Sequence, residues 1–143
     1  MDREIEFLNK LYQNAEMGRD SSKEVLNSLE EGSAIRDIIQ GQLKDYEFQL
    51  IQIKELILKR NGEIEENSAM GKMMTSMSIT MKTMMDASDS KIAEMMIQGS
   101  DMGVIDINKL LNDHPTLTGE VRQIAEDLRD MQQRQNQSLK SYL

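Results

Sequence analysis

The near absence of proline is the feature that most constrains how this chain can fold. Its 143 residues include one proline, Pro115. Proline ends or kinks helices because it lacks a backbone N–H and its ring clashes with the preceding turn. Long helices are therefore allowed on both sides of it. Apolar residues recur at intervals of three and four, and no stretch alternates as a strand would. The chain is predicted to be all-α.

Capping signals divide the chain into five helical segments. Gly32, Asn61 and Gly62 are residues that tolerate the left-handed conformation at a helix end, and Pro115 marks a later break. The connection at Gly32 is short, so the two helices it joins should be antiparallel neighbours. We expect a single domain over residues 1–143, with helices at about 3–31, 34–60, 69–85, 90–112 and 116–142.

Four of these helices are long, and each carries an apolar stripe wide enough to close a shared core. The short helix, 69–85, would carry the chain back along the bundle, so that helix 90–112 runs parallel to helix 34–60. The expected fold is therefore a four-helix bundle with up-down-down-up topology and a helical crossover.

The crossover segment is rich in methionine. Flexible thioethers fill irregular gaps, so packing against the bundle is the favoured interpretation. Copper(I) binding by paired thioethers, a surface for a protein partner and an oxidation sensor are the alternatives. The seven methionines recur at intervals of three and four: Met70, Met73, Met74, Met77, Met81, Met84 and Met85.

Composition makes several classes of function unattractive. A formal net charge of −8 without a basic stripe disfavours nucleic acid and anionic membranes as partners. The chain has no cysteine, which excludes disulfides and thiolate metal sites. No apolar run of about 18 residues is present to span a bilayer, and the charged start, MDREIEF, does not resemble a secretory signal. We expect a soluble, cytoplasmic protein.

Three stretches of the sequence resemble a known family. They are NAEMGR at residues 14–19, the pair Tyr46-Glu47, and IAEMMIQGS at residues 92–100 with the following Met102-Gly103. They resemble a bacterial, clostridial-type family of small ferritin-like domains of unknown function, over nearly the whole chain. The resemblance implies a ferritin-like bundle with a helical crossover. It does not by itself imply iron.

A ferritin-type di-iron centre requires inward carboxylates and two histidines in Glu-x-x-His motifs. The one histidine, His114, falls in the break before the last helix, so the histidine half of the motif is missing. Carboxylates alone offer an alternative site for iron or manganese. Asp106 is expected on an inner helix face, whereas Glu94 is expected to point outward. The candidate metal ligands are Glu16, Glu47, Glu94 and Asp106.

A buried polar layer is the favoured interpretation of these residues. Arg19 falls within the apolar stripe of the first helix, where an unpaired charge is strongly unfavourable, so we expect Asp106 or Glu47 to neutralise it. Inward-facing glutamines can complete a hydrogen-bonded layer: Gln42, Gln49, Gln132 and Gln135. We expect no catalytic residues and no cofactor. A non-catalytic structural or interaction protein is the favoured function, and a carboxylate-based metal-binding or iron-storage protein is the alternative.

Two glycines, Gly99 and Gly103, lie four residues apart on the expected inner face of helix 90–112. Each weakens the helix intrinsically. We therefore expect them to admit the close approach of a neighbouring backbone.

Some apolar residues fall outside the main stripes. Phe48, Ile51 and Leu58 do so on helix 34–60, and Phe7 and Val25 on helix 3–31. Together they predict an apolar patch across these two helices. Its burial in an antiparallel homodimer is the hypothesis that follows.

Overall fold

The computed structural model describes residues 2–65 and 88–143. Within these ranges all regular structure is helical: α1 (Asp2–Ser28), α2 (Arg36–Lys59), α4 (Asp89–Asp113) and α5 (Gly119–Lys140). The prediction of an all-α protein with four long helices is confirmed for these residues. The expected methionine-rich helix at 69–85 lies outside the described residues. None of the described helices has the length and apolar character of a membrane span.

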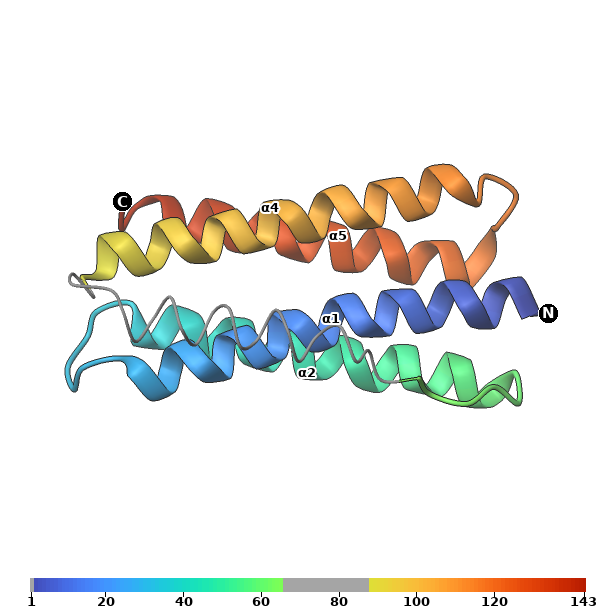
Figure 1. Cartoon of the computed structure of the whole chain (residues 1–143), viewed down its shortest axis with the longest axis horizontal. Helices are drawn as coiled ribbons and strands as arrows, with labels where there is room; N and C mark the ends of the chain where they lie inside the picture. Colours follow the sequence, from blue (N-terminus) through green and yellow to red (C-terminus); the bar gives the residue numbers. More distant parts are fainter. Residues whose placement is uncertain (1, 66–87) are drawn as a thin grey trace.

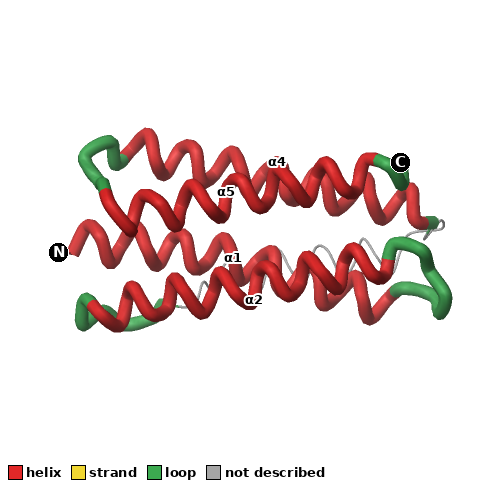
Figure 2. Tube along the Cα trace, turned by 180° about the vertical axis from the view of Figure 1, so that it is seen from behind, coloured by secondary structure: helices red, strands yellow, loops and turns green. Residues whose placement is uncertain are grey.

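The four helices form two antiparallel hairpins that lie side by side (Figures 1 and 2). One hairpin is α1 with α2, and the other is α4 with α5; α1 packs against α4 and α2 against α5 where the hairpins meet. In Figure 1, α2 and α4 run in one direction and α1 and α5 in the other. The described helices therefore have the up-down-down-up order expected from the sequence.

Residues that tolerate the left-handed conformation lie near the helix ends. Gly32 (φ 83°) and Asn61 (φ 59°) adopt it in the turns after α1 and α2, as their residue types suggested. α1 nevertheless ends at Ser28, and α5 begins at Gly119, each three residues short of the expected limit. Thr118, at the N-cap position, is extended and makes no capping hydrogen bond with its side chain, so α5 begins only after it.

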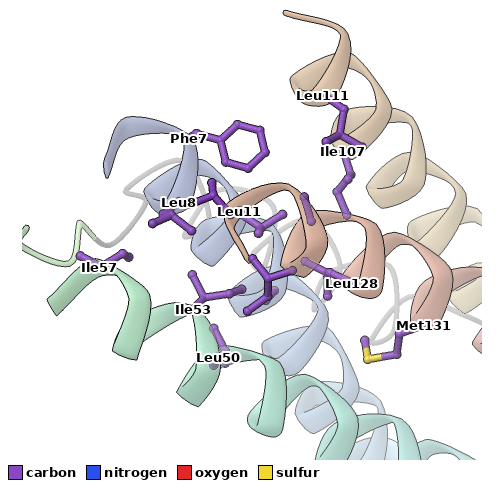
Figure 3. Packing of buried hydrophobic residues seen from close by; sticks show 14 of the residues in the cluster. Phe7, Leu8, Leu11, Leu50, Ile53, Ile57, Ile107, Leu111, Leu128 and Met131 are labelled. Atoms are coloured by element: carbon purple, nitrogen blue, oxygen red, sulfur yellow. The ribbon is translucent and has the colours of Figure 1, made fainter. Parts of the chain in front are cut away.

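The apolar core is divided into two clusters. The first apolar cluster lies toward the end where α1 begins, and it includes the fully buried Leu11, Ile53 and Leu128 (Figure 3). Fully burying one such side chain contributes about 1.5–3 kcal/mol. The second apolar cluster lies toward the other end of the hairpins: Val25, Ile35, Ile39, Ile92, Ala93, Met96 and Leu139.

The expected apolar patch across the first two helices is only partly correct. Phe7 and Val25 are 0% exposed, because α1 packs against both α2 and α4 and so buries a wider face than its main stripe. Phe7 packs edge-on against the ring of His114, with the ring centroids 5.3 Å apart. On α2 the prediction is confirmed, since Phe48, Ile51 and Leu58 are 58%, 58% and 52% exposed.

A belt of buried polar side chains accompanies the two apolar clusters where the hairpins meet. It contains the four glutamines expected from the sequence, so the burial of that layer is confirmed. Every described helix contributes to it. The polar belt consists of Glu16, Ser22, Gln42, Gln49, Ser100, Gln132, Gln135 and Asn136.

Polar contacts also join the hairpins at both ends. At one end, the Arg60 guanidinium lies 2.6 Å from a carboxylate oxygen of Glu4 and 3.0 Å from one of Glu120, which links α1, α2 and α5. At the other end, the Ser33 hydroxyl donates a hydrogen bond of 2.6 Å to Asp89 at the start of α4. The two hairpins are therefore held in register at their ends, and the polar belt lies between these ties.

Candidate functional site

The four carboxylates proposed as metal ligands differ in their surroundings. Glu16 is buried in α1, whereas Glu47 on α2 and Glu94 on α4 are exposed. Asp106 was expected to face inward, but it is exposed. Across the described ranges, no group of three Asp, Glu or His side chains lies close enough to hold a metal ion. The described residues therefore do not fit a ferritin-type di-iron centre, and the weaker carboxylate-metal hypothesis stays a prediction.

The partner expected for Arg19 was also wrong. Its guanidinium lies 2.9 Å from Asp20 and 3.6 Å from Glu16, both on its own helix, rather than beside Asp106 or Glu47. Burial lowers the pKa of Arg19, but the hydrogen bond to Asp20 and the charges of Asp20 and Glu16 outweigh it and raise the pKa overall. Local pairs along α1 therefore neutralise this charge.

A groove of about 110 Å³ lies between α1 and α4, next to the polar belt. Met17 of α1 and Met96 and Met102 of α4 form apolar parts of its wall. Tyr46 of α2 and Gln132 of α5 are buried and form its floor. Met102 is 56% exposed at the mouth of the groove. All four described helices thus contribute to one concave site, which we call the α1–α4 groove.

Two glycines allow the floor residues to reach the groove. A Cβ on Gly18 would overlap the ring of Tyr46. A Cβ on Gly103 would lie 2.9 Å from both the nitrogen and the oxygen of the Gln132 amide. The close approach expected at Gly103 is therefore made by a side chain of α5 rather than by a backbone. At Gly99 the described residues do not show the expected close packing, since a Cβ there would meet none of them within 4 Å.

A chain of hydrogen bonds orients the amide of Gln132. The Asn14 amide nitrogen donates to the backbone carbonyl of Gly103 at 3.2 Å, and the Asn14 oxygen accepts from Gln132 Nε2 at 2.8 Å. A carbonyl can only accept, so this order fixes which way each amide points. Gln132 Oε1 is then left without a hydrogen-bond donor among the described residues. A buried acceptor in that state costs about 1–3 kcal/mol.

The other group at the floor of the groove, the phenol of Tyr46, is neutral. Burial raises the pKa of Tyr46 to about 12, and donation to its phenolic oxygen by the Gln132 amide N–H and the Ser100 hydroxyl opposes part of that rise. The phenol therefore stays protonated at physiological pH. The charged group lining the groove is the carboxylate of Asp106, which is exposed. The interior of the groove is thus built from thioethers, an aromatic ring and neutral hydrogen-bonding groups.

Sequence reasoning identified several of these residues without bringing them together. It placed Gln132 on an inner face, which its burial confirms, and it included Tyr46 and Met96 in the stretches that resemble the family. It assigned no role to Asn14 beyond its place in the NAEMGR stretch. The available signal was the presence of small residues at positions 18 and 103, opposite large polar residues on other helices. The stretches on which the family resemblance rests all contribute to this groove.

Comparison with known proteins gives a family but no activity. No curated protein matches the chain, and no solved structure matches it. A family model described as a domain of unknown function (DUF2383) matches residues 3–113, from the first turn of α1 to the end of α4. The match covers well over half of the chain, which therefore belongs to the family described as a domain of unknown function (DUF2383).

Proposed function

We propose that this protein is a non-catalytic, cytoplasmic interaction protein built on a ferritin-like bundle, and that its α1–α4 groove binds a small, uncharged organic molecule. The up-down-down-up order of the described helices supports the ferritin-like architecture. The observation that carries the binding function is Gln132 Oε1, which is buried without a donor among the described residues at the floor of a groove with mostly apolar walls. Ligand pockets typically combine apolar walls with a few oriented polar groups.

The size of the groove limits the ligand. An apolar cavity of about 150 Å³ holds benzene, so a groove of about 110 Å³ accommodates one small ring or a short branched chain. Larger substituents would extend from the open side past Met102. Methionine side chains adapt to the shape of what they contact. We infer a ligand of roughly ring size, with a polarisable apolar body.

The chemistry of the floor selects a hydrogen-bond donor. The free acceptor is an amide oxygen, which pairs with an O–H or N–H group. An ionised ligand would lose its hydration without a charged partner at the floor, and that loss is expensive. The ligand we propose is therefore neutral, with one donor directed at Gln132.

The neutrality of the floor also supports binding rather than catalysis. General acid–base catalysis is most effective when a group titrates near the working pH. Tyr46 has a pKa raised to about 12, and amides do not titrate. The groove thus offers shape and hydrogen bonds, which suffice to bind and orient a molecule.

Phenol and anisole provide a matched pair of probes. Both are single rings, but only phenol has a hydroxyl donor. With the methionine methyl groups labelled with ¹³C, titration with phenol should shift the NMR signals of Met17, Met96 and Met102, and anisole should bind about fivefold more weakly.

Two variants test whether Gln132 accepts the hydrogen bond from the phenol hydroxyl. Gln132→Met keeps a side chain of similar length but removes the acceptor, so phenol should bind it no better than anisole. Gln133→Met changes an exposed neighbour and should leave the preference unchanged. Equal affinity of the native chain for both probes, or an unchanged preference in Gln132→Met, would contradict the proposal.

A further inference from the structure

The outer face of α2 carries a row of exposed apolar residues away from the α1–α4 groove. Phe48, Ile51 and Leu58, which we call the α2 strip, follow one another at intervals of three and seven residues. Positions with these spacings lie on one side of a helix. All three are more than half exposed, so this side of α2 presents three apolar side chains to solvent.

The charges beside the strip differ from those of the chain as a whole. The chain carries a net charge of −8. Along the strip, Lys44 and Lys54 alternate with Glu47 and Glu55, all four of them exposed. With Asp45, which is also exposed and lies three residues before Phe48, this edge carries two positive and three negative charges and is close to neutral. It is therefore a surface at which two copies of an acidic protein can meet with little local repulsion.

When two copies of α2 lie antiparallel, the strip and the charges beside it on one copy are complementary to those on the other. In an antiparallel pair centred midway between residues 49 and 50, Phe48 of one copy faces Ile51 of the other. In the same register Lys44 faces Glu55, and each pairing occurs twice by symmetry. Leu58 then lies beside Gly41, which is exposed and would have nothing within 4 Å of an added Cβ. Apolar contacts thus occupy the centre, and opposite charges flank them.

We propose that α2 is a homodimer interface, in which the α2 strip packs antiparallel against the α2 strip of a second copy. The inference rests on the outer face of α2 and does not depend on ligand binding. The groove opens between α1 and α4, so it stays accessible in the dimer. With three apolar side chains per copy, the association is weak and depends on protein concentration.

Sedimentation velocity on the full chain tests this interface. From about 1 µM to about 200 µM, the native protein should pass from monomer to dimer, and Ile51→Lys should stay monomeric with unchanged circular dichroism. A monomer at the highest concentration would overturn the proposal, and so would a dimer unaffected by Ile51→Lys.

Charge reversal tests the antiparallel register. Lys44→Glu and Glu55→Lys should each weaken the dimer about tenfold, because each creates two like-charge contacts. The double variant should restore the native dimerisation constant. Lys23→Glu, on the exposed surface of α1, is the matched control and should have no comparable effect. A double variant as weak as the single ones would exclude the proposed register.

Discussion

Glycine serves two different purposes in the helices that form the groove. At Gly18 the absence of a side chain leaves room for the ring of Tyr46, and at Gly103 it leaves room for the amide of Gln132. At Gly99 and Gly41 no neighbour uses the space. Among the described residues of one copy, packing therefore requires glycine at two of these positions and not at the other two.

Alanine substitutions should separate these roles. Gly18→Ala should lower the free energy of unfolding by about 1–3 kcal/mol, because the added methyl overlaps the Tyr46 ring. Gly99→Ala and the control Gly41→Ala should raise it by up to about 1 kcal/mol through helix propensity. Urea denaturation followed by circular dichroism measures all three. A stabilising Gly18→Ala would show that Tyr46 does not occupy that space.

Two amides of the polar belt should be replaceable. Both polar atoms of Gln42 and of Gln135 are buried without hydrogen-bond partners among the described residues. Replacing either with methionine removes an unsatisfied group while keeping its volume, so each variant should gain about 1 kcal/mol of stability. Gln132→Met should gain less, because it also removes the hydrogen bond to Asn14. Loss of stability in both Gln42→Met and Gln135→Met would contradict this description of the belt.

At the scale of the helices, sequence periodicity predicted where the helices lie in the chain more accurately than which of their residues are buried. Intervals of three and four identify the inner stripe of α2, and the exposure of Phe48 and Ile51 agrees with it. On α1 the same reasoning missed Phe7 and Val25, because contact with two neighbouring helices widens the buried face. Asp106 was misplaced for the opposite reason. It lies where α4 borders the open α1–α4 groove, so a nominally inward position reaches solvent there.

The ion pairs that Arg60 makes with Glu4 and Glu120 should make the stability of the fold depend on pH. The hydrogen bonds from Arg60, then those from Lys59, lower the pKa of Glu120 in the folded protein. Because the pKa of Glu120 is lower in the folded protein, its ion pairs stabilise the fold fully at pH values above the pKa of the unfolded chain, about 4.3. That stabilisation is lost as the pH falls through the pKa of the folded protein.

Arg60→Gln isolates that contribution. The variant should melt at a lower temperature than the native chain at pH 7, and the difference should shrink below about pH 4 and in about 1 M salt. Lys23→Gln, an exposed change on α1, is the control. A difference that stays constant across this pH range would mean that the ion pairs with Glu4 and Glu120 do not stabilise the fold.

For the whole molecule, the sequence predicts the architecture but not the site. The positions and directions of the four described helices, and most of their core residues, follow from local patterns. The groove depends on contacts between distant residues, such as the hydrogen bond between Asn14 and Gln132, which are 118 positions apart. Periodicity says which face of a helix is buried but not which residues of other helices it meets. That information appears only when the two hairpins are placed together.

The absence of a converging carboxylate set among the described residues predicts the metal content. Glu16 is buried beside Arg19, whereas Glu47, Glu94 and Asp106 are exposed. We expect less than stoichiometric iron or manganese in protein purified without chelators from metal-supplemented cells, measured by elemental mass spectrometry. Two metal ions per chain, lost in a Glu16→Gln/Glu47→Gln variant, would instead support the carboxylate-based alternative.

The central claim is that the α1–α4 groove binds a neutral hydrogen-bond donor at Gln132. A crystal structure of the protein soaked with 4-bromophenol tests it most directly, because anomalous scattering locates the bromine without ambiguity. We expect a ring among Met17, Met96 and Met102, with the hydroxyl within hydrogen-bonding distance of Gln132 Oε1. A ring bound elsewhere, or one whose hydroxyl points away from Gln132, would contradict it.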